Sequence, residues 1–132
     1  MSLFVNKKDT FTIPVSVQVS GDKVLCAASG DIEVISKWDS AGETKQYNFV
    51  FRSPDFKSNS EILDKSIDLI DGRIKFNSGS LRLQRMLKLL VSWDLKDDEG
   101  KDVPVNPDTI GSLNPVIAIT VGTELEKVLD TV

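Results

Sequence analysis

The chain contains no histidine and one cysteine, Cys26, among its 132 residues. Without histidine, the Ser-His and Cys-His pairs that activate a nucleophile are excluded, and so are metal sites with imidazole ligands. One cysteine allows neither an internal disulfide nor a cysteine-ligated zinc site within this chain. Because Cys26 lies in a short apolar run, we expect it to be a small buried side chain in a reducing compartment.

The sequence also lacks long apolar runs and a basic excess. No run approaches the length of a membrane span, and the first residues lack the apolar core of a signal peptide. The 16 basic and 20 acidic residues give a net charge of -4. Proteins that bind nucleic acid or anionic membranes normally carry a basic excess or a basic face. We therefore expect a soluble intracellular protein with no nucleic-acid and no membrane partner.

The motifs of common enzymes and metal sites are missing as well. The glycines form neither of the common phosphate-binding loops. Five acidic residues between positions 94 and 102 raise the question of a calcium or magnesium site. Lys96 interrupts that series and Gly100 is out of phase with a calcium-binding loop, so a solvated turn is favoured. We predict no catalytic residue, no cofactor and no metal, and an enzyme is the third hypothesis after two protein-binding ones.

Alternating hydrophobicity indicates that the first half of the chain is β-rich. Residues 11–19 alternate between apolar and polar side chains, which is typical of a half-buried strand whose polar face meets water. Pro14 places this strand at an edge or beside a bulge. Residues 24–28 predict a second short strand. Residues 31–38 and 44–52 are rich in β-branched and aromatic residues and predict a hairpin with a glycine-containing loop.

Helical patterns dominate the second half. Residues 58–61 form a capping-box pattern, and the apolar stripe that follows ends at Asp71-Gly72, which predicts a first helix. Residues 73–76 fit either a short strand or an irregular link. Residues 81–93 carry an apolar stripe and predict a second helix. That stripe consists of Leu83, Met86, Leu87, Leu90 and Val91.

Two further helix starts are predicted by capping residues. Asn106-Pro107 and Asn114-Pro115 each place a capping side chain before a proline at the first helical position. The acidic run before them has to turn the chain, and Gly100 is free to take a positive φ there. The stripe of the last helix consists of Ile117, Val121, Leu125 and either Val128 or Leu129.

Together these elements predict one α+β domain that spans residues 1–132. Residues 1–56 would form an antiparallel β-meander or a small sandwich, and residues 57–132 would contribute three to four helices. Free strand edges in the first half allow pairing with a partner or with a second copy of the chain, as a homo-oligomer. Trp38, at a strand end beside a loop, fits a core role and an interface role about equally.

One series of caps and turns points to a family. Its parts are the strand Phe49-Val50-Phe51-Arg52, a helix end at Trp93, an acidic turn around Gly100 and the helix starts at Asn106-Pro107 and Asn114-Pro115. This series, mainly within residues 31–116, resembles the small tail assembly chaperones of long-tailed bacteriophages. The β region before residue 31 is fuller than in that family. That excess leaves a virion structural protein of the tail or the head-tail junction as the alternative.

The resemblance implies a non-enzymatic protein that acts in the host cytoplasm during tail assembly. Its partners would be the tape measure and tail tube proteins. Ile117, Val121 and Leu125 would line an apolar groove that shields amphipathic segments of the tape measure. The resemblance also suggests structural hinge points, which are Trp93, Gly100, Asn106 and Pro107. Under the alternative, the protein stays in the virion and contacts other virion subunits through its β edges.

Overall fold

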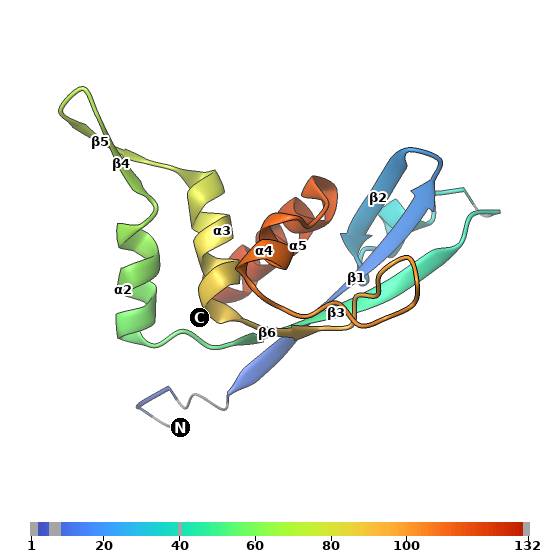
Figure 1. The fold of residues 1–132 in the computed structure, drawn as a ribbon, viewed down its shortest axis with the longest axis horizontal. Helices are drawn as coiled ribbons and strands as arrows, with labels where there is room; N and C mark the ends of the chain where they lie inside the picture. Colours follow the sequence, from blue (N-terminus) through green and yellow to red (C-terminus); the bar gives the residue numbers. More distant parts are fainter. Residues whose placement is uncertain (1–2, 6–8, 40, 131–132) are drawn as a thin grey trace.

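The computed structural model describes residues 3–5, 9–39 and 41–130 and has an α+β fold, which confirms the predicted class (Figure 1). Strands dominate the first part of the chain and helices the last. The strands are β1 (Thr10–Ser20), β2 (Lys23–Ala28), β3 (Thr44–Arg52), β4 (Ile67–Ile70), β5 (Arg73–Phe76) and β6 (Leu90–Trp93). The helices are α1 (Ile32–Ile35), α2 (Phe56–Asp64), α3 (Ser78–Leu89), α4 (Pro107–Gly111) and α5 (Pro115–Asp130).

The core lies between a four-stranded antiparallel sheet and the longer helices. The strand order is β2-β1-β3-β6. Along β1, Ile13, Val15 and Val17 are buried on one face, as their alternation predicts. The fully buried Phe49 and Phe51 of β3 extend this apolar face. α5 packs against β1 and β2, and α3 packs against α5, so two helices cover the sheet.

The opposite face of β1 departs from the sequence prediction. Thr12 and Pro14 are exposed as expected, but Ser16 and Gln18 are buried instead of facing water. The chain after β2 folds over them, so that Ser16 Oγ lies 3.0 Å from Ser29 Oγ and Gln18 Nε2 donates to the Asp39 carbonyl at 2.8 Å. These hydrogen bonds offset part of the cost of burying polar groups, while Gln18 Oε1 is buried without a partner among the described residues. The expected wet face is therefore half covered.

Pro14 lies where the pairing of β1 with β2 ends. The last pair between the two strands is Val15 with Ala28, and the Pro14 carbonyl accepts from the Ser29 N–H at 3.1 Å. The residues of β1 before this point pair with β3 alone. The prediction that this strand lies at an edge is therefore wrong for most of β1, which is central in the sheet, and only its first residues, up to Pro14, have one edge without β2.

The predicted hairpin between residues 31–38 and 44–52 is wrong. β3 pairs with β1 along its whole length, from Thr10 opposite Arg52 to Gln18 opposite Thr44. The other predicted strand contains α1, whose first turn is capped by Asp31, because the Asp31 side chain accepts from the Val34 N–H at 3.4 Å. A local cap and a better partner for β3 outweigh the β propensity of this segment.

The first predicted helix is shorter than its pattern and begins earlier. Asp55, and not Ser58, caps α2, and the helix ends at Asp64. The predicted stop at Asp71-Gly72 is instead the turn of a β-hairpin between β4 and β5. Both residues have positive φ, 51° and 75°, which is the conformation of a two-residue type I′ turn. Residues 73–76 are a strand, so the first of the two alternatives is correct.

The second predicted helix is wrong at its end. α3 stops at Leu89, and Leu90–Trp93 forms β6, which pairs with β3. The predicted stripe is also rotated, since Leu83, Leu87 and Val91 are exposed. The buried residues of α3 are Leu81, Met86 and Leu89. The open edge of β3 accounts for this change, because it offers a ladder of hydrogen bonds to residues that would otherwise extend the helix.

The two later helix starts are confirmed. Asn106 and Thr109 form a reciprocal capping box at α4, with N···O distances of 2.9 and 3.0 Å, and Pro107 is the first helical residue. The Asn114 side chain accepts from the Val116 N–H at 2.9 Å where α5 begins. In α5 the apolar stripe continues at Leu129, which packs against the core. Within the described residues, none of the helices combines the length and apolar character needed to cross a membrane.

Replacing Asn106 with alanine should lower the free energy of unfolding by about 1 kcal/mol, because the Thr109 N–H loses its acceptor. Urea unfolding followed by circular dichroism would measure the change. Asn106→Asp keeps the capping oxygen and should remain close to the parent chain. Equal destabilisation of both variants would show that the side chain is needed for something other than the cap.

Candidate protein-binding groove

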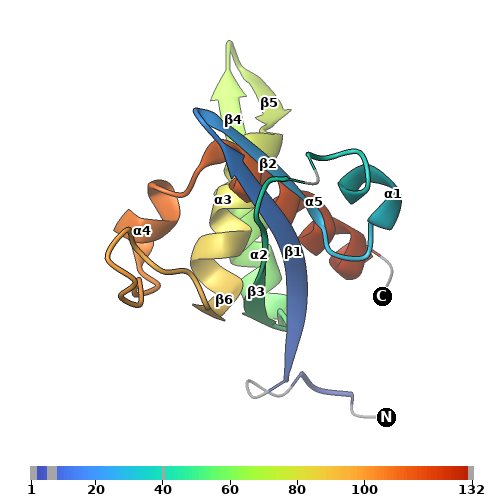
Figure 2. The same cartoon turned by 90° about the vertical axis from the view of Figure 1, so that its right-hand side faces the viewer.

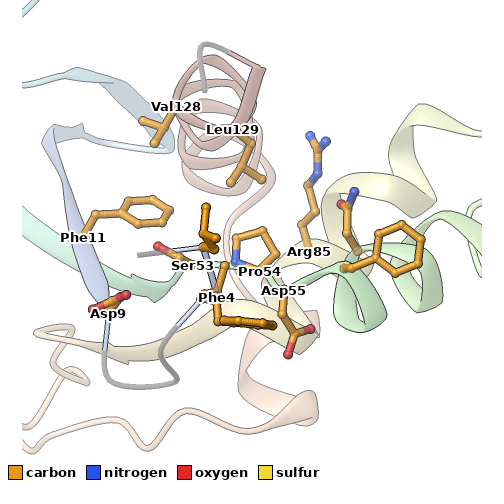
Figure 3. A pocket seen from close by; sticks show the side chains of 13 residues that line it. Phe4, Asp9, Phe11, Ser53, Pro54, Asp55, Arg85, Val128 and Leu129 are labelled. Carbon is orange, nitrogen blue, oxygen red and sulfur yellow. The ribbon is translucent and has the colours of Figure 1, made fainter. Parts of the chain in front are cut away.

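An open groove of about 680 Å³ lies where β1 begins, β3 ends and α5 ends (Figure 3). Its volume is in the range of ligand and peptide pockets. Figure 3 shows Val128 and Leu129 of α5 on one side, above Pro54 and Phe4. The apolar lining consists of Leu3, Phe4, Val5, Phe11, Pro54, Phe56, Val128 and Leu129. The polar lining consists of Asp9, Ser53, Asp55, Asn59 and Arg85.

Large apolar side chains of this groove face solvent. Phe4 is 85% exposed and Phe56 is 90% exposed. Single exposed apolar residues are common on soluble proteins, but several large ones around one hollow are typical of an interaction site. Aromatic rings are also the residues that most often anchor a protein partner, because they bury a large area at a small entropic cost. The groove is therefore the best candidate for a binding surface in the described part of the chain.

Local sequence places Phe56 at the groove. β3 ends at Arg52, and Pro54, two residues further on, has no N–H with which to continue the sheet. Asp55 then caps α2 by accepting from the Ser58 N–H at 2.8 Å, so the next residue, Phe56, is the first of the helix. The helix contacts the rest of the protein through residues further along its length. The side chain at its first position is therefore free to point outward. This arrangement explains why an aromatic ring here is exposed.

Polar contacts hold α2 beside α3 and so fix one wall of the groove. Arg52 Nε donates to the Lys88 carbonyl at 3.2 Å, and Arg52 Nη2 donates to Ser58 Oγ at 3.3 Å. Lys88 Nζ also donates to the Glu61 carboxylate. This hydrogen bond, with the charge of the lysine, holds the pKa of Glu61 below its ordinary value. These contacts lie outside the groove lining, but they join the end of β3 to both helices and so fix the helices that carry Phe56 and Arg85.

The residues predicted for partner binding lie elsewhere. Val121 and Leu125 are fully buried, and Ile117 packs partly buried against the same core, so the proposed groove along α5 is occupied by the protein's own sheet. This corrects the site inferred from the resemblance. The stripe is apolar because it covers the sheet, and a partner has no access to Val121 or Leu125. Trp38 is half-buried after α1 and does not line the groove.

The four predicted hinge residues fall around one loop. Trp93 ends β6, where its ring meets Phe49 edge-on at a centroid distance of 6.0 Å and its Nε1 donates to the Val103 carbonyl at 2.7 Å. Gly100 has φ +79°, as its turn requires, and Asn106 and Pro107 start α4. Trp93 also meets Ile117 in the lining of a second hollow, of about 340 Å³. These contacts fasten the acidic loop to the sheet.

The acidic segment itself is a self-contained turn. Asp97 Oδ1 accepts from the N–H groups of Glu99 and Lys101, both at 2.9 Å, and Lys96 pairs with Asp102. Within the described residues, no three potential metal-ligating side chains converge. The side chains of the acidic segment are thus occupied in shaping the loop.

Cys26 lies in β2 and is half-buried, not fully buried as expected. This partial burial raises the pKa of its thiol, which lowers its nucleophilicity at neutral pH.

A second exposed apolar surface lies on the β4–β5 hairpin. In Figures 1 and 2 this hairpin projects from the rest of the molecule beyond α2 and α3. Ile67 pairs with Phe76, and Ile74 lies two residues from Phe76, so the three share one face of the hairpin. They are 44%, 52% and 76% exposed, respectively. Isolated two-stranded hairpins are only marginally stable in water, so this element is suited to association.

Sequence reasoning missed both exposed surfaces. The groove unites residues near positions 4, 11, 55, 85 and 128, which no local pattern connects. The sequence signal for the groove was Phe56, an aromatic residue directly after a capping Asp. The side chain at that first helical position is rarely buried. The hairpin was missed because Asp71-Gly72 fits a helix end as well as a tight turn.

No protein-family model, no curated protein and no solved structure matches the chain.

Proposed function

We propose that this chain is a non-enzymatic tail assembly chaperone of a long-tailed bacteriophage, which binds tape measure and tail tube proteins in the host cytoplasm. The observation that supports the proposal best is the groove, whose rim exposes Phe4 and Phe56. A protein that shields aggregation-prone segments needs such an apolar surface in its free state. The proposed identity of the partners rests on the series of caps and turns that resembles the chaperone family.

The proposed mechanism is reversible shielding. An amphipathic helix of the tape measure would lay its apolar face in the groove, against Phe4, Phe56 and Leu129, until tail tube subunits replace the chaperone. No bond is made or broken in this process. The groove lies between the end of α5 and the start of α2, so a bound helix would not disturb the buried stripe of α5.

A virion structural protein is the second candidate, favoured by the β4–β5 hairpin. Its exposed Ile74 and Phe76, together with the outer edges of β2 and β6, which pair with no further strand of the described residues, suit a subunit that stays fixed to its neighbours. Mass spectrometry of purified particles and of the lysate that produced them separates the two candidates. A chaperone is abundant in the lysate and absent from particles. A structural subunit is present in particles at a fixed ratio to the tube protein, and that result would overturn our proposal.

Phe56→Ser should weaken binding to the tape measure protein by about 30-fold or more, which corresponds to the loss of a hot-spot aromatic side chain of at least 2 kcal/mol. Co-purification from cells that express both proteins, followed by titration, would measure it. Ile32→Ser is the matched control, because Ile32 is 75% exposed on α1 and lies outside the groove. Equal binding by the two variants would remove the groove from the mechanism.

A further inference from the structure

Two arginines of α3 each have a buried Nε donor that forms no hydrogen bond among the described residues. Arg82 and Arg85 are three residues apart, so they share one side of the helix. The Nε atom of each is buried, and neither atom has a hydrogen-bond partner among the described residues. No ion pair joins either guanidinium to a carboxylate in that part of the chain. Buried donors without acceptors are rare in folded proteins, so these two need an explanation.

The nearby Arg52 shows that the fold is able to satisfy an arginine. Its Nε donates to the Lys88 carbonyl at 3.2 Å and its Nη2 donates to Ser58 Oγ at 3.3 Å. These acceptors come from the helices α3 and α2, which also flank the groove. Because Arg52 finds acceptors on both helices, the missing partner of Arg85 Nε follows from the position of Arg85 and not from a general lack of acceptors in this region.

The side chain of Arg82 has a packing role. A Cβ atom at Gly122 of α5 would lie 3.0 Å from Arg82 Cδ, so the methylene groups of this arginine fill the space at the helix crossing. Gly122 therefore permits the close approach of α3 and α5. Arg82 does not line the groove. The methylene groups of Arg82 therefore have a role at the helix crossing, although they supply no acceptor for its buried Nε.

Arg85 is different because it lines the groove. Figure 3 shows its side chain on the other side of the groove from Phe11, with the guanidinium directed away from Pro54 and Phe4. The groove thus contains a guanidinium whose buried Nε is unpaired, in a lining that includes two exposed aromatic rings. A carboxylate matches the planar donors of a guanidinium and forms strong charge-assisted hydrogen bonds with it.

We propose that the groove binds an amphipathic helix of a partner protein that carries one glutamate or aspartate on its apolar face, and that this carboxylate pairs with Arg85. The inference rests on the proposed function, since it concerns the same groove and adds the chemistry of the partner. Asp9 and Asp55 line the groove too, so a ligand with many negative charges, such as a nucleic acid or an anionic membrane, is disfavoured. A single carboxylate within an apolar stripe satisfies both the cation and the aromatic rim.

The first test uses the free chain. Arg85→Met keeps an unbranched side chain and removes the unpaired donor, so its melting temperature should equal or exceed that of the parent chain. Arg52→Met, the matched control, loses two hydrogen bonds and should melt at a lower temperature. If Arg85→Met is destabilised as much as Arg52→Met, Arg85 has a structural role and the inference is overturned.

The second test uses fluorescein-labelled synthetic amphipathic helices. Each carries a single glutamate at one position of a leucine-rich stripe, and each has a twin with glutamine there. Fluorescence anisotropy with the full chain should show at least one pair in which the glutamate peptide binds about tenfold more tightly. With Arg85→Met that preference should vanish while the glutamine twin binds as before.

The outcomes separate this inference from the proposed function. Equal binding of all twins to the parent chain would overturn the role of Arg85 and leave the groove as an apolar helix-binding site. A glutamate preference that survives in Arg85→Met would also overturn it. If no peptide binds, or if Phe56→Ser binds all of them as the parent does, the groove itself fails and both proposals fall.

Discussion

Replacing Leu125 with alanine should lower the free energy of unfolding by about 3 kcal/mol. Leu125 is fully buried in the middle of α5, together with Val121, against the apolar face of the sheet. Truncating it removes apolar contacts and leaves a cavity that close-packed neighbours fill only in part. Urea unfolding monitored by circular dichroism should show a lower midpoint with an unchanged slope.

Ile119→Ala provides the control on the same helix. Ile119 is 52% exposed, so its truncation should change the free energy of unfolding by no more than about 0.5 kcal/mol. The pair of variants distinguishes two accounts of α5. If Leu125→Ala leaves stability unchanged and weakens partner binding, the α5 stripe faces a partner, as the resemblance implies. If it destabilises the free chain, the stripe belongs to the core.

Features that depend on neighbours in sequence were predicted well. The caps at Asn106 and Asn114 and the positive φ of Gly100 involve atoms within a few residues of one another. Such contacts form in the same way whatever surrounds them. The burial of Ile13 and Val15 was also predictable, because a strict alternation has one interpretation when a strand has a core on one side.

Features that depend on a distant partner were not predictable. Residues 31–38 and 90–93 have similar β propensity, yet the first contains a helical turn and the second is a strand. The difference lies in β3, whose two edges are taken by β1 and β6. A sequence pattern gives the propensity of a segment and not the edge that is available to it. The strand pairing of this fold therefore follows from its three-dimensional structure and not from the propensity of each segment.

The candidate site failed in a related way. The stripe of Ile117, Val121 and Leu125 was identified correctly as apolar, but a stripe that covers the protein's own sheet and one that covers a partner look the same in sequence. The groove, in contrast, takes its lining from both ends of the chain and from its middle. Exposure of Phe56 and the unpaired Nε of Arg85 become visible only once those segments are placed together.

Phe49→Ala should have the largest effect on stability, a loss of about 4 kcal/mol. Phe49 is fully buried in β3, between β1 and β6, and its ring meets Trp93 edge-on at 6.0 Å. Its removal empties the centre of the sheet and takes away the ring against which Trp93 packs. Trp93 Nε1 donates to the Val103 carbonyl at 2.7 Å, so loosening the Trp93 ring should also free the loop before α4. Guanidinium unfolding followed by tryptophan fluorescence would measure both effects.

Gln46→Ala is the control for Phe49→Ala, since Gln46 lies exposed on the same strand and its truncation should cost no more than about 0.5 kcal/mol. Amide hydrogen exchange adds a second readout. In Phe49→Ala, the N–H groups of residues 95–105 should exchange faster even where the rest of the sheet stays protected, because their anchor through Trp93 is weakened. A loss below about 1 kcal/mol would mean that Phe49 does not face the core. The pairing of β3 with β1 would then have to be shifted by one residue, which would turn every side chain of β3 to the opposite face.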